Sequence, residues 1–193
     1  PYLGICLGMQ AAVIEFARSQ LNIPKANSAE FDPDLTEEEA VVIFMPEGSR
    51  SQMGGTMRLG ARTTIIKPGS AAAALHQGAS NVEERHRHRY EVSPQAVEAL
   101  EAAGLFFTGR DETGQRMEIA EMVGGPTSPQ KSTGKGVTAV GSGVPTHPYF
   151  LAAQYHPEYK SRPGRPSPLF KGLLEAAADY RHKKSASITA EGE

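Results

Sequence analysis

The chain has 193 residues, of which 39% are hydrophobic and 22% charged, and its formal net charge is −2. This length and composition, with no apolar run near the length of a membrane span, predict one soluble cytoplasmic domain that binds neither nucleic acid nor a membrane. The single cysteine excludes an internal disulfide framework and suits a reducing compartment.

The first ten residues place that cysteine, Cys6, between a short apolar run and an amphipathic segment. Apolar residues recur every three or four positions over 7–21, which predicts a helix whose buried face carries Leu7, Ala11, Ile14, Ala17 and Leu21. Cys6 then lies on a tight strand-to-helix turn between Gly4 and Gly8, the pattern of a nucleophile elbow, and the helix N-terminus favours its thiolate. Taken alone, a lone cysteine is as typical of a small buried hydrophobe.

Several strand-like segments follow. Residues 40–45 form a continuous apolar run, typical of a central parallel strand buried on both faces. The polar segment before it, 25–39, is predicted to be mostly loop and contains Glu30. Beyond it we predict two short strands at 56–60 and 62–66, a weak helix or turn at 70–76, and a strand at 82–92.

The strand at 82–92 carries a basic cluster at 85–90 that suggests nucleic-acid or phosphate binding. The cluster is isolated and flanked by acidic residues, so a solvated strand face is an equally good interpretation. His86 and His88 share one face of the strand and could bind a metal, but no further ligand of suitable spacing lies nearby. We therefore expect neither nucleic acid nor a metal here.

The clearest helix begins at Ser93 and Pro94 and stops at Gly104. Serine caps a helix, proline fits the first turn, and glycine follows the last. Two strands are predicted next, at 105–108 and 116–123, joined by a turn at 111–114.

The rest of the chain divides into an insertion, a helix and a tail. Residues 124–145 are rich in Gly, Ser, Thr and Pro and are interpreted as an exposed insertion. The last helix begins at 167–168, and its expected buried side carries Leu169, Phe170, Leu173, Leu174 and Ala177. Residues 182–193 are predicted to form a polar, fraying tail.

A histidine and a carboxylate follow a strand predicted at 149–155. Residues two apart in an extended segment point to the same side, so His156 and Glu158 should project together from the strand end. Glu158 would then orient the ring of His156, and His156 would serve Cys6 as a base. Such a pair is common without any catalytic role, and it is the combination with Cys6 that favours catalysis.

These motifs together resemble a known family. The run Gly-Ile-Cys-Leu-Gly-Met-Gln at 4–10, with His-Pro-Glu at 156–158, resembles the triad (class I) glutamine amidotransferases. Within them, the match is closest to the glutaminase domains of the CTP synthase family, which four further stretches resemble: 27–31, 53–60, 84–92, and 161–163 with 166–168. Residues between 124 and 146 lie outside the resemblance.

The resemblance implies an α/β fold with a doubly wound, mainly parallel, flavodoxin-like sheet flanked by helices. It implies that residues 1–181 are a glutamine amidotransferase domain, incomplete at its N-terminus, because in the family a preceding glycine-rich segment supplies oxyanion-hole amides.

For the chemistry, the resemblance implies that L-glutamine is hydrolysed through a thioester on Cys6. His156 acts as general base and then acid, and Glu158 orients it. The Leu7 amide would donate to the oxyanion. The family's glutamine-binding residues match Gln10, Glu30 and Arg89, with Glu30 at the α-ammonium group and Arg89 at the α-carboxylate.

By the same resemblance, no cofactor or metal belongs to this chain. A synthase domain elsewhere in a longer, tetrameric protein would use ATP, magnesium and the released ammonia to aminate UTP, with GTP as activator, for which contacts are expected near 54–59. Two alternatives stay open: a related cysteine hydrolase of other amides, and an incomplete fragment that serves as an assembly or regulatory surface. The pair of Glu30 and Arg89 favours free glutamine as the substrate.

Overall fold

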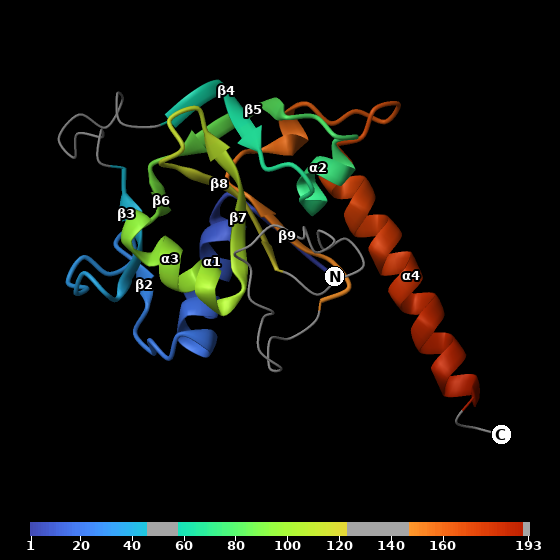
Figure 1. The fold of residues 1–193 in the computed structure, drawn as a ribbon, viewed down its shortest axis with the longest axis horizontal. Helices are drawn as coiled ribbons and strands as arrows, with labels where there is room; N and C mark the ends of the chain where they lie inside the picture. Colours follow the sequence, from blue (N-terminus) through green and yellow to red (C-terminus); the bar gives the residue numbers. More distant parts are fainter. Residues whose placement is uncertain (46–57, 123–146, 191–193) are drawn as a thin grey trace.

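The structure is a computed structural model that describes residues 1–45, 58–122 and 147–190, with side chains to 184 (Figure 1). Its strands are β1 (Tyr2–Ile5), β2 (Asn27–Ser28), β3 (Ala40–Phe44), β4 (Arg58–Ile66), β5 (Asn81–His88), β6 (Tyr90–Val92), β7 (Leu105–Asp111), β8 (Met117–Met122) and β9 (Phe150–Ala153). Its helices are α1 (Leu7–Gln20), α2 (Ala71–Leu75), α3 (Pro94–Ala103) and α4 (Pro168–Ala190), with a 3-10 turn, η1 (Pro157–Tyr159).

The strands form a larger sheet of order β1-β9-β8-β7-β4-β5 and a smaller one of order β2-β3-β6. Among the described strands, β1 runs parallel to β9 and β2 to β3, while the other pairs are antiparallel. The α/β class is as predicted, but the sheet is mixed and mostly antiparallel, so the prediction of a doubly wound, mainly parallel sheet was wrong. Strands β7 and β8 illustrate the reason: a tight turn joins them, and parallel strands need a crossover of about a dozen residues.

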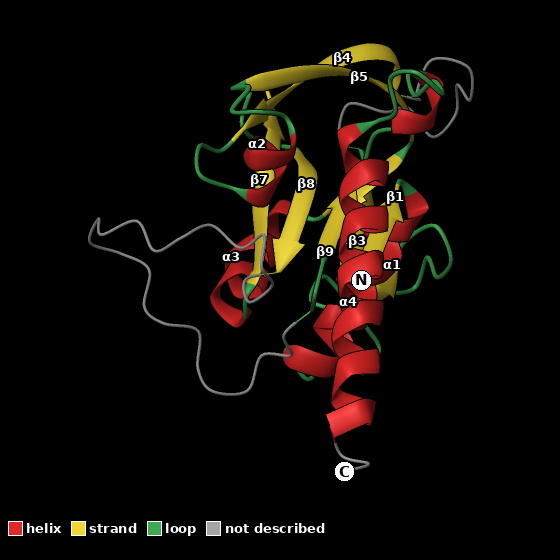
Figure 2. Cartoon of the chain, turned by 90° about the vertical axis from the view of Figure 1, so that its right-hand side faces the viewer, coloured by secondary structure: helices red, strands yellow, loops and turns green. Residues whose placement is uncertain are grey.

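The larger sheet is curled into a half-barrel. In Figure 2 its last strands, β4 and β5, arch over the top of the molecule, away from the plane of β7, β8 and β9. The curl carries β5 round toward the turn after β9: the His156 N–H donates to the Arg85 carbonyl over 2.8 Å. Strands from opposite ends of the sheet order therefore meet at one place.

Helices cover both faces of the larger sheet. Successive residues of β8 show this, because Ala120 belongs to the core cluster under α1 and α3, and Ile119 belongs to the cluster under α2 and α4. The smaller sheet packs on the far side of α1 through Val41 and Val42. The flanking helices are as predicted. No helix in the described ranges is long and apolar enough to cross a membrane.

Helix α1 forms where predicted, but its buried side is different. Leu7 is 52% exposed, and the fully buried positions are Met9, Val13 and Ala17. Ala11 is exposed, whereas Ile14 is buried as expected. The first turn of α1 lines a pocket beside Cys6. Leu7 therefore belongs to the wall of this pocket and not to the buried side of the helix.

Three strand predictions needed correction. The run at 40–45 forms β3, but β3 lies in the smaller sheet, parallel to β2 and antiparallel to β6. The strand expected at 82–92 is split at Arg89 into β5 and β6, which belong to different sheets. The two strands expected around Gly60 are one strand, β4, which passes through this residue with a φ of 87°, a value that glycine tolerates. Residues 56–57 are outside the described ranges.

Helix α4 begins as predicted and continues to Ala190, past the point where fraying was expected. Leu169 is fully buried, but Leu174 is 70% exposed and Ala177 is also exposed, because only the first turns pack against the body. Figure 1 shows the rest of the helix projecting away. The insertion predicted at 124–145 lies outside the described residues.

Candidate active site

Cys6 occupies the turn between β1 and α1, as the sequence predicts. Its φ of 52° and ψ of −105° are rare for a residue with a side chain. The Cys6 N–H donates to the Ala153 carbonyl over 2.7 Å, which ties the turn to the end of β9. The strain and this anchor are the backbone features of a nucleophile elbow.

The two glycines around Cys6 are not equivalent. A Cβ atom on Gly4 would lie 2.8 Å from the backbone C and O of Gly8 and 2.9 Å from the Tyr2 hydroxyl oxygen. A Cβ atom on Gly8 would meet only that hydroxyl, at 3.9 Å. The close approach of strand and helix therefore requires glycine at Gly4, whereas a side chain fits at Gly8.

His156 and Glu158 lie together after β9. The His156 Nδ1 and the Glu158 Oε1 are 2.6 Å apart, so the predicted contact is present. The predicted reason was wrong, because Glu158 lies in the 3-10 turn η1 and not in an extended segment. The other ring nitrogen, Nε2, is buried and has no hydrogen-bond partner among the described residues. That nitrogen is available to exchange a proton.

Strand β5 joins the two halves of this site through its backbone. The Arg85 carbonyl accepts the His156 N–H, and the Arg87 carbonyl lies 4.0 Å from the Cys6 Sγ, within contact distance for a sulfur donor. Because residues two apart on a strand point their carbonyls to the same edge, one edge of β5 contacts both the His156 backbone and the Cys6 side chain. The parallel pairing of β1 and β9, with Ile5 opposite Ala153, independently brings together the backbones that lead to Cys6 and His156.

A pocket of about 320 Å³ opens beside Cys6. Its lining contains every predicted glutamine-binding residue together with the nucleophile; the full lining is Cys6, Leu7, Gln10, Glu30, Arg87, His88, Arg89 and Tyr90. Glu30 is exposed at this pocket, while Gln10 is only 3% exposed. His156 and Glu158 are outside this lining, beyond the end of β9.

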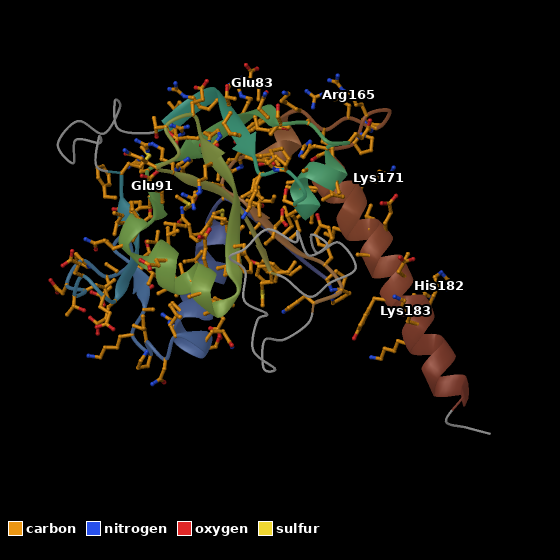
Figure 3. The ribbon with its side chains drawn as sticks, in the orientation of Figure 1. Glu83, Glu91, Arg165, Lys171, His182 and Lys183 are labelled. Atoms are coloured by element: carbon orange, nitrogen blue, oxygen red, sulfur yellow. The ribbon has the colours of Figure 1, made fainter. Side chains whose placement is uncertain are left out.

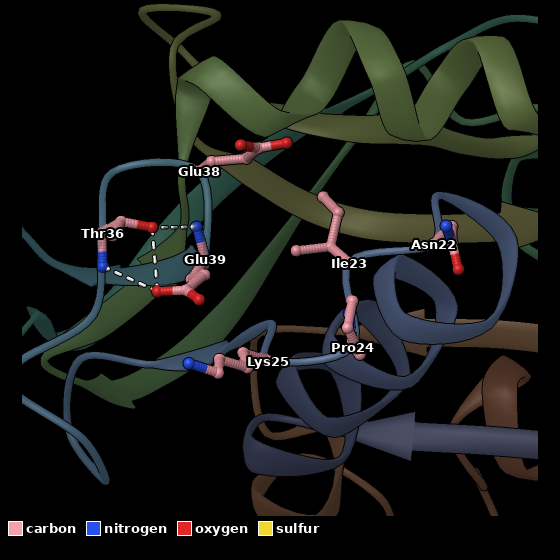
Figure 4. Close-up of a pocket in the computed structure, with 7 residues that line it drawn as sticks. All are labelled: Asn22, Ile23, Pro24, Lys25, Thr36, Glu38 and Glu39. Carbon is pink, nitrogen blue, oxygen red and sulfur yellow. Dashed lines mark hydrogen bonds between the residues drawn. The ribbon is translucent and has the colours of Figure 1, made fainter.

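A second pocket, of about 340 Å³, lies away from this site (Figure 4). It is formed by the segment after α1 and the loop before β3, including Lys25 and Glu39. The Glu39 Oε2 accepts hydrogen bonds from the backbone N–H and the hydroxyl of Thr36 at 3.0 and 2.9 Å, which ties this carboxylate to its own loop. Nothing in this lining suggests a reaction.

A buried amide that the sequence analysis missed, Gln154, lies against the nucleophile. Its Nε2 donates to the Cys6 Sγ at 3.5 Å, and its Oε1 accepts a hydrogen bond from the Gln10 Nε2 at 3.2 Å. The same Gln10 nitrogen donates to the Tyr90 carbonyl at 2.8 Å. The available signal was a single amide in the otherwise apolar run before His156.

Burial raises the pKa of the Cys6 thiol above its ordinary value. Hydrogen bonds from the Leu7 N–H and from Gln154 lower it, and the negative charges of Glu158 and Glu30 raise it further. The predicted help from the helix N-terminus is present, but burial outweighs it. A thiol held in this state needs a base to become a nucleophile.

No metal centre is found in the described ranges, where no group of three or more His, Cys, Asp or Glu side chains is arranged to hold an ion. His86 and His88 contact each other through Nδ1 and Nε2, 3.2 Å apart, which occupies nitrogens that a metal would need.

A sequence profile described as Glutamine amidotransferase class-I matches residues 1–176. The chain therefore belongs to the class-I glutamine amidotransferase family. Its curated relatives include CTP synthases: that of Eremothecium gossypii is 49% identical over 182 residues, and that of Drosophila melanogaster is 48% identical over 180. These alignments cover 93% of this chain but 28% and 25% of the relatives, so the chain spans about a quarter of their length.

A solved structure agrees with these relatives. The glutaminase domain of Trypanosoma brucei CTPS with bound acivicin superposes with a TM-score of 0.74 at 35% sequence identity. The match covers 93% of this chain and 60% of that one.

Proposed function

We propose that this chain is the glutaminase part of a CTP synthase and hydrolyses L-glutamine through a thioester. The observation that carries the proposal is the pocket: one cavity of about 320 Å³ combines a cysteine on a strained elbow with an acidic, a basic and an amide side chain. These are the groups that recognise the ammonium, carboxylate and amide of free glutamine.

In the first step, the Cys6 Sγ attacks the side-chain amide carbon of glutamine as His156 Nε2 takes the thiol proton. The amide oxygen becomes an oxyanion, toward which the Leu7 N–H donates. When the carbon–nitrogen bond breaks, His156 gives the proton to the departing ammonia. Water then attacks the thioester, with His156 again as base, and glutamate leaves as the thiol re-forms.

Glu158 orients His156 and stabilises its charged form. Its contact on Nδ1 fixes the proton of the neutral ring there, which leaves Nε2 as the atom that accepts the thiol proton. The carboxylate is half-exposed, so this contact contributes little to the free energy of unfolding. Its role is catalytic orientation.

Glutamine is held by groups from three parts of the chain. Arg89 pairs with the α-carboxylate, because a guanidinium presents two parallel donors to it, and Glu30 faces the α-ammonium group. Both N–H groups of Gln10 are donated within the protein, to the Tyr90 carbonyl and the Gln154 Oε1, so its own Oε1 is left to accept a hydrogen bond from the substrate.

In the longer protein, the ammonia would be used by a synthase domain to aminate UTP at the expense of ATP and magnesium, giving CTP. This part of the proposal rests on the CTP synthase relatives. It includes a tetramer activated by GTP; the segment 54–59, where GTP contacts were expected, lies largely outside the described residues. The domain limits at 1–181 are part of the same proposal.

Release of glutamate from L-glutamine by the purified chain tests the proposal. The wild-type chain should turn over glutamine, Cys6→Ala should abolish turnover, and Glu158→Gln should lower kcat by about tenfold or more with little change in melting temperature. Faster hydrolysis of other γ-glutamyl amides would indicate a related amidohydrolase. A folded chain with no activity, alone or joined to a synthase domain, would favour an assembly or regulatory role.

A further inference from the structure

Two buried histidines on β5 are not used by the proposed chemistry. His86 and His88 are 2% and 6% exposed, and both project from the inner face of the curled sheet. Their neighbours are the charged side chains of β4 and β8: Arg58 lies opposite His88 in the strand register, and its guanidinium donates to the Glu118 carboxylate at 2.9 Å. Glu118 Oε1 is 3.9 Å from the His86 Nε2.

The contacts of these rings have a fixed direction. His88 Nδ1 is 3.2 Å from the Tyr90 carbonyl, and a carbonyl only accepts, so this nitrogen carries the proton. The other nitrogen of His88, Nε2, is 3.2 Å from His86 Nδ1. If Nε2 were also protonated, His88 would be a buried cation beside Arg58, an arrangement that costs free energy. His88 Nε2 therefore accepts, and His86 Nδ1 donates to it.

The Tyr90 carbonyl links these rings to the nucleophile. The Tyr90 carbonyl accepts from both His88 and Gln10, so His88 helps to hold the oxygen on which the Gln10 nitrogen is anchored. The Gln154 Oε1 accepts from that nitrogen, and the Gln154 Nε2 therefore points at the Cys6 sulfur. If the Gln10 amide turned over, Gln154 would turn with it and place an oxygen against the sulfur.

We propose that His88, oriented by His86, is a positioning residue that holds the Tyr90 carbonyl in the place where it anchors the Gln10 and Gln154 amides, and so keeps a hydrogen-bond donor on the Cys6 sulfur. His88 lines the pocket but has no step of its own in the proposed hydrolysis. The inference deepens the proposed function and names how the fold prepares both the nucleophile and the amide-binding oxygen of Gln10. The chain of contacts runs from β5 through Tyr90 of β6 to Gln10 of α1 and to Gln154, which follows β9.

Two variants of His88 separate positioning from packing. Asparagine can place an N–H near the position of Nδ1, whereas leucine fills similar space without a donor. In the 193-residue chain, the pH midpoint of Cys6 alkylation by iodoacetamide should rise by about half a unit to one unit in His88→Leu, because the thiolate loses its donor. His88→Asn should restore the wild-type midpoint. Glu83→Gln, an exposed change on the same strand (Figure 3), is the control and should leave it unchanged.

Nitrogen-15 NMR of the histidine rings in the unmodified chain tests the direction itself, and it needs no substitution. His88 should be neutral with the proton on Nδ1, and His86 should also carry a proton on Nδ1. A proton on His88 Nε2 instead, or an unchanged alkylation midpoint in folded His88→Leu, would overturn the inference. Neither readout requires glutamine turnover, so failure here is distinguishable from failure of the proposed function.

Discussion

Gly4 and Gly8 flank the nucleophile symmetrically in sequence but have different surroundings. The backbone of the first helical turn occupies the space that a Gly4 side chain would need. The space beside Gly8 is free as far as the Tyr2 hydroxyl. The Tyr2 hydroxyl also donates to the Gly8 carbonyl over 2.7 Å, which holds the start of α1 against β1. The close approach of strand and helix is thus concentrated at one glycine.

The first prediction compares alanine at these two positions. Gly4→Ala should lower the free energy of unfolding by about 1–3 kcal/mol and slow Cys6 alkylation, because the elbow must shift to admit the methyl group. Gly8→Ala should be neutral or stabilising by up to about 1 kcal/mol, because alanine favours a helix more than glycine does. Urea denaturation and alkylation rates measure both effects. Equal losses in the two variants would contradict the asymmetry.

Some functional residues could be predicted from sequence and others could not. Cys6 and His156 belong to short motifs whose chemistry is recognisable, and Arg89 was found through a family resemblance. Gln154 and His88 act through contacts with residues distant along the chain, and nothing in their local sequence identifies those partners. Their roles depend on which strands become neighbours.

At the scale of the elements, helix boundaries were predicted best. Proline and glycine mark the two ends of α3, where Gly104 adopts a φ of 110° after the last turn. Strand direction was predicted worst, because it depends on long-range pairing: β9 lies between β1 and β8, although β1 and β9 are far apart in the sequence. Period-2 patterns identify strands but not their partners. The break at Arg89, which assigns β5 and β6 to different sheets, has no sequence signal of this kind.

The second prediction concerns two leucines of α4. Leu169 is fully buried beneath Tyr149, whose hydroxyl donates to the Leu169 carbonyl over 3.0 Å, whereas Leu174 is 70% exposed. Leu169→Ala should lower the free energy of unfolding by about 2–5 kcal/mol, since it leaves a cavity. Leu174→Ala should change it by less than about 0.5 kcal/mol. Denaturant titration of both variants checks this, and a large effect at Leu174 would show that this face of α4 is packed in solution.

At the scale of the whole molecule, buried titratable groups make stability depend on pH. Burial lowers the pKa of His86 to about 3 and that of His88 to about 4, from 6.5. The folded chain therefore binds fewer protons than the unfolded chain between these values. The stabilising contribution of the neutral rings is complete above pH 6.5 and is lost as the pH falls toward 4. Burial raises the pKa of Glu118 and Glu121, which acts in the opposite direction.

The third prediction concerns the loss of stability that these histidines cause as the pH falls. Between pH 7 and about pH 5, each histidine should lower the free energy of unfolding by about 2 kcal/mol. His88→Asn removes one titrating ring, so its loss of stability over this interval should be smaller than that of the wild type by about this amount. The glutamate contributions are common to both chains and largely cancel in the difference. Parallel pH dependences for the two proteins would show that the fold does not lower the pKa of His88.

The most direct test of the glutaminase account is peptide mass mapping after exposure to an electrophilic glutamine analogue, with and without competing L-glutamine. The account predicts a single adduct on Cys6 that free glutamine suppresses, because the nucleophile and the pocket of Glu30 and Arg89 bind the same molecule. D-glutamine serves as the control and should protect less. A folded chain that forms no adduct on Cys6, or forms one that L-glutamine does not suppress, would contradict the account.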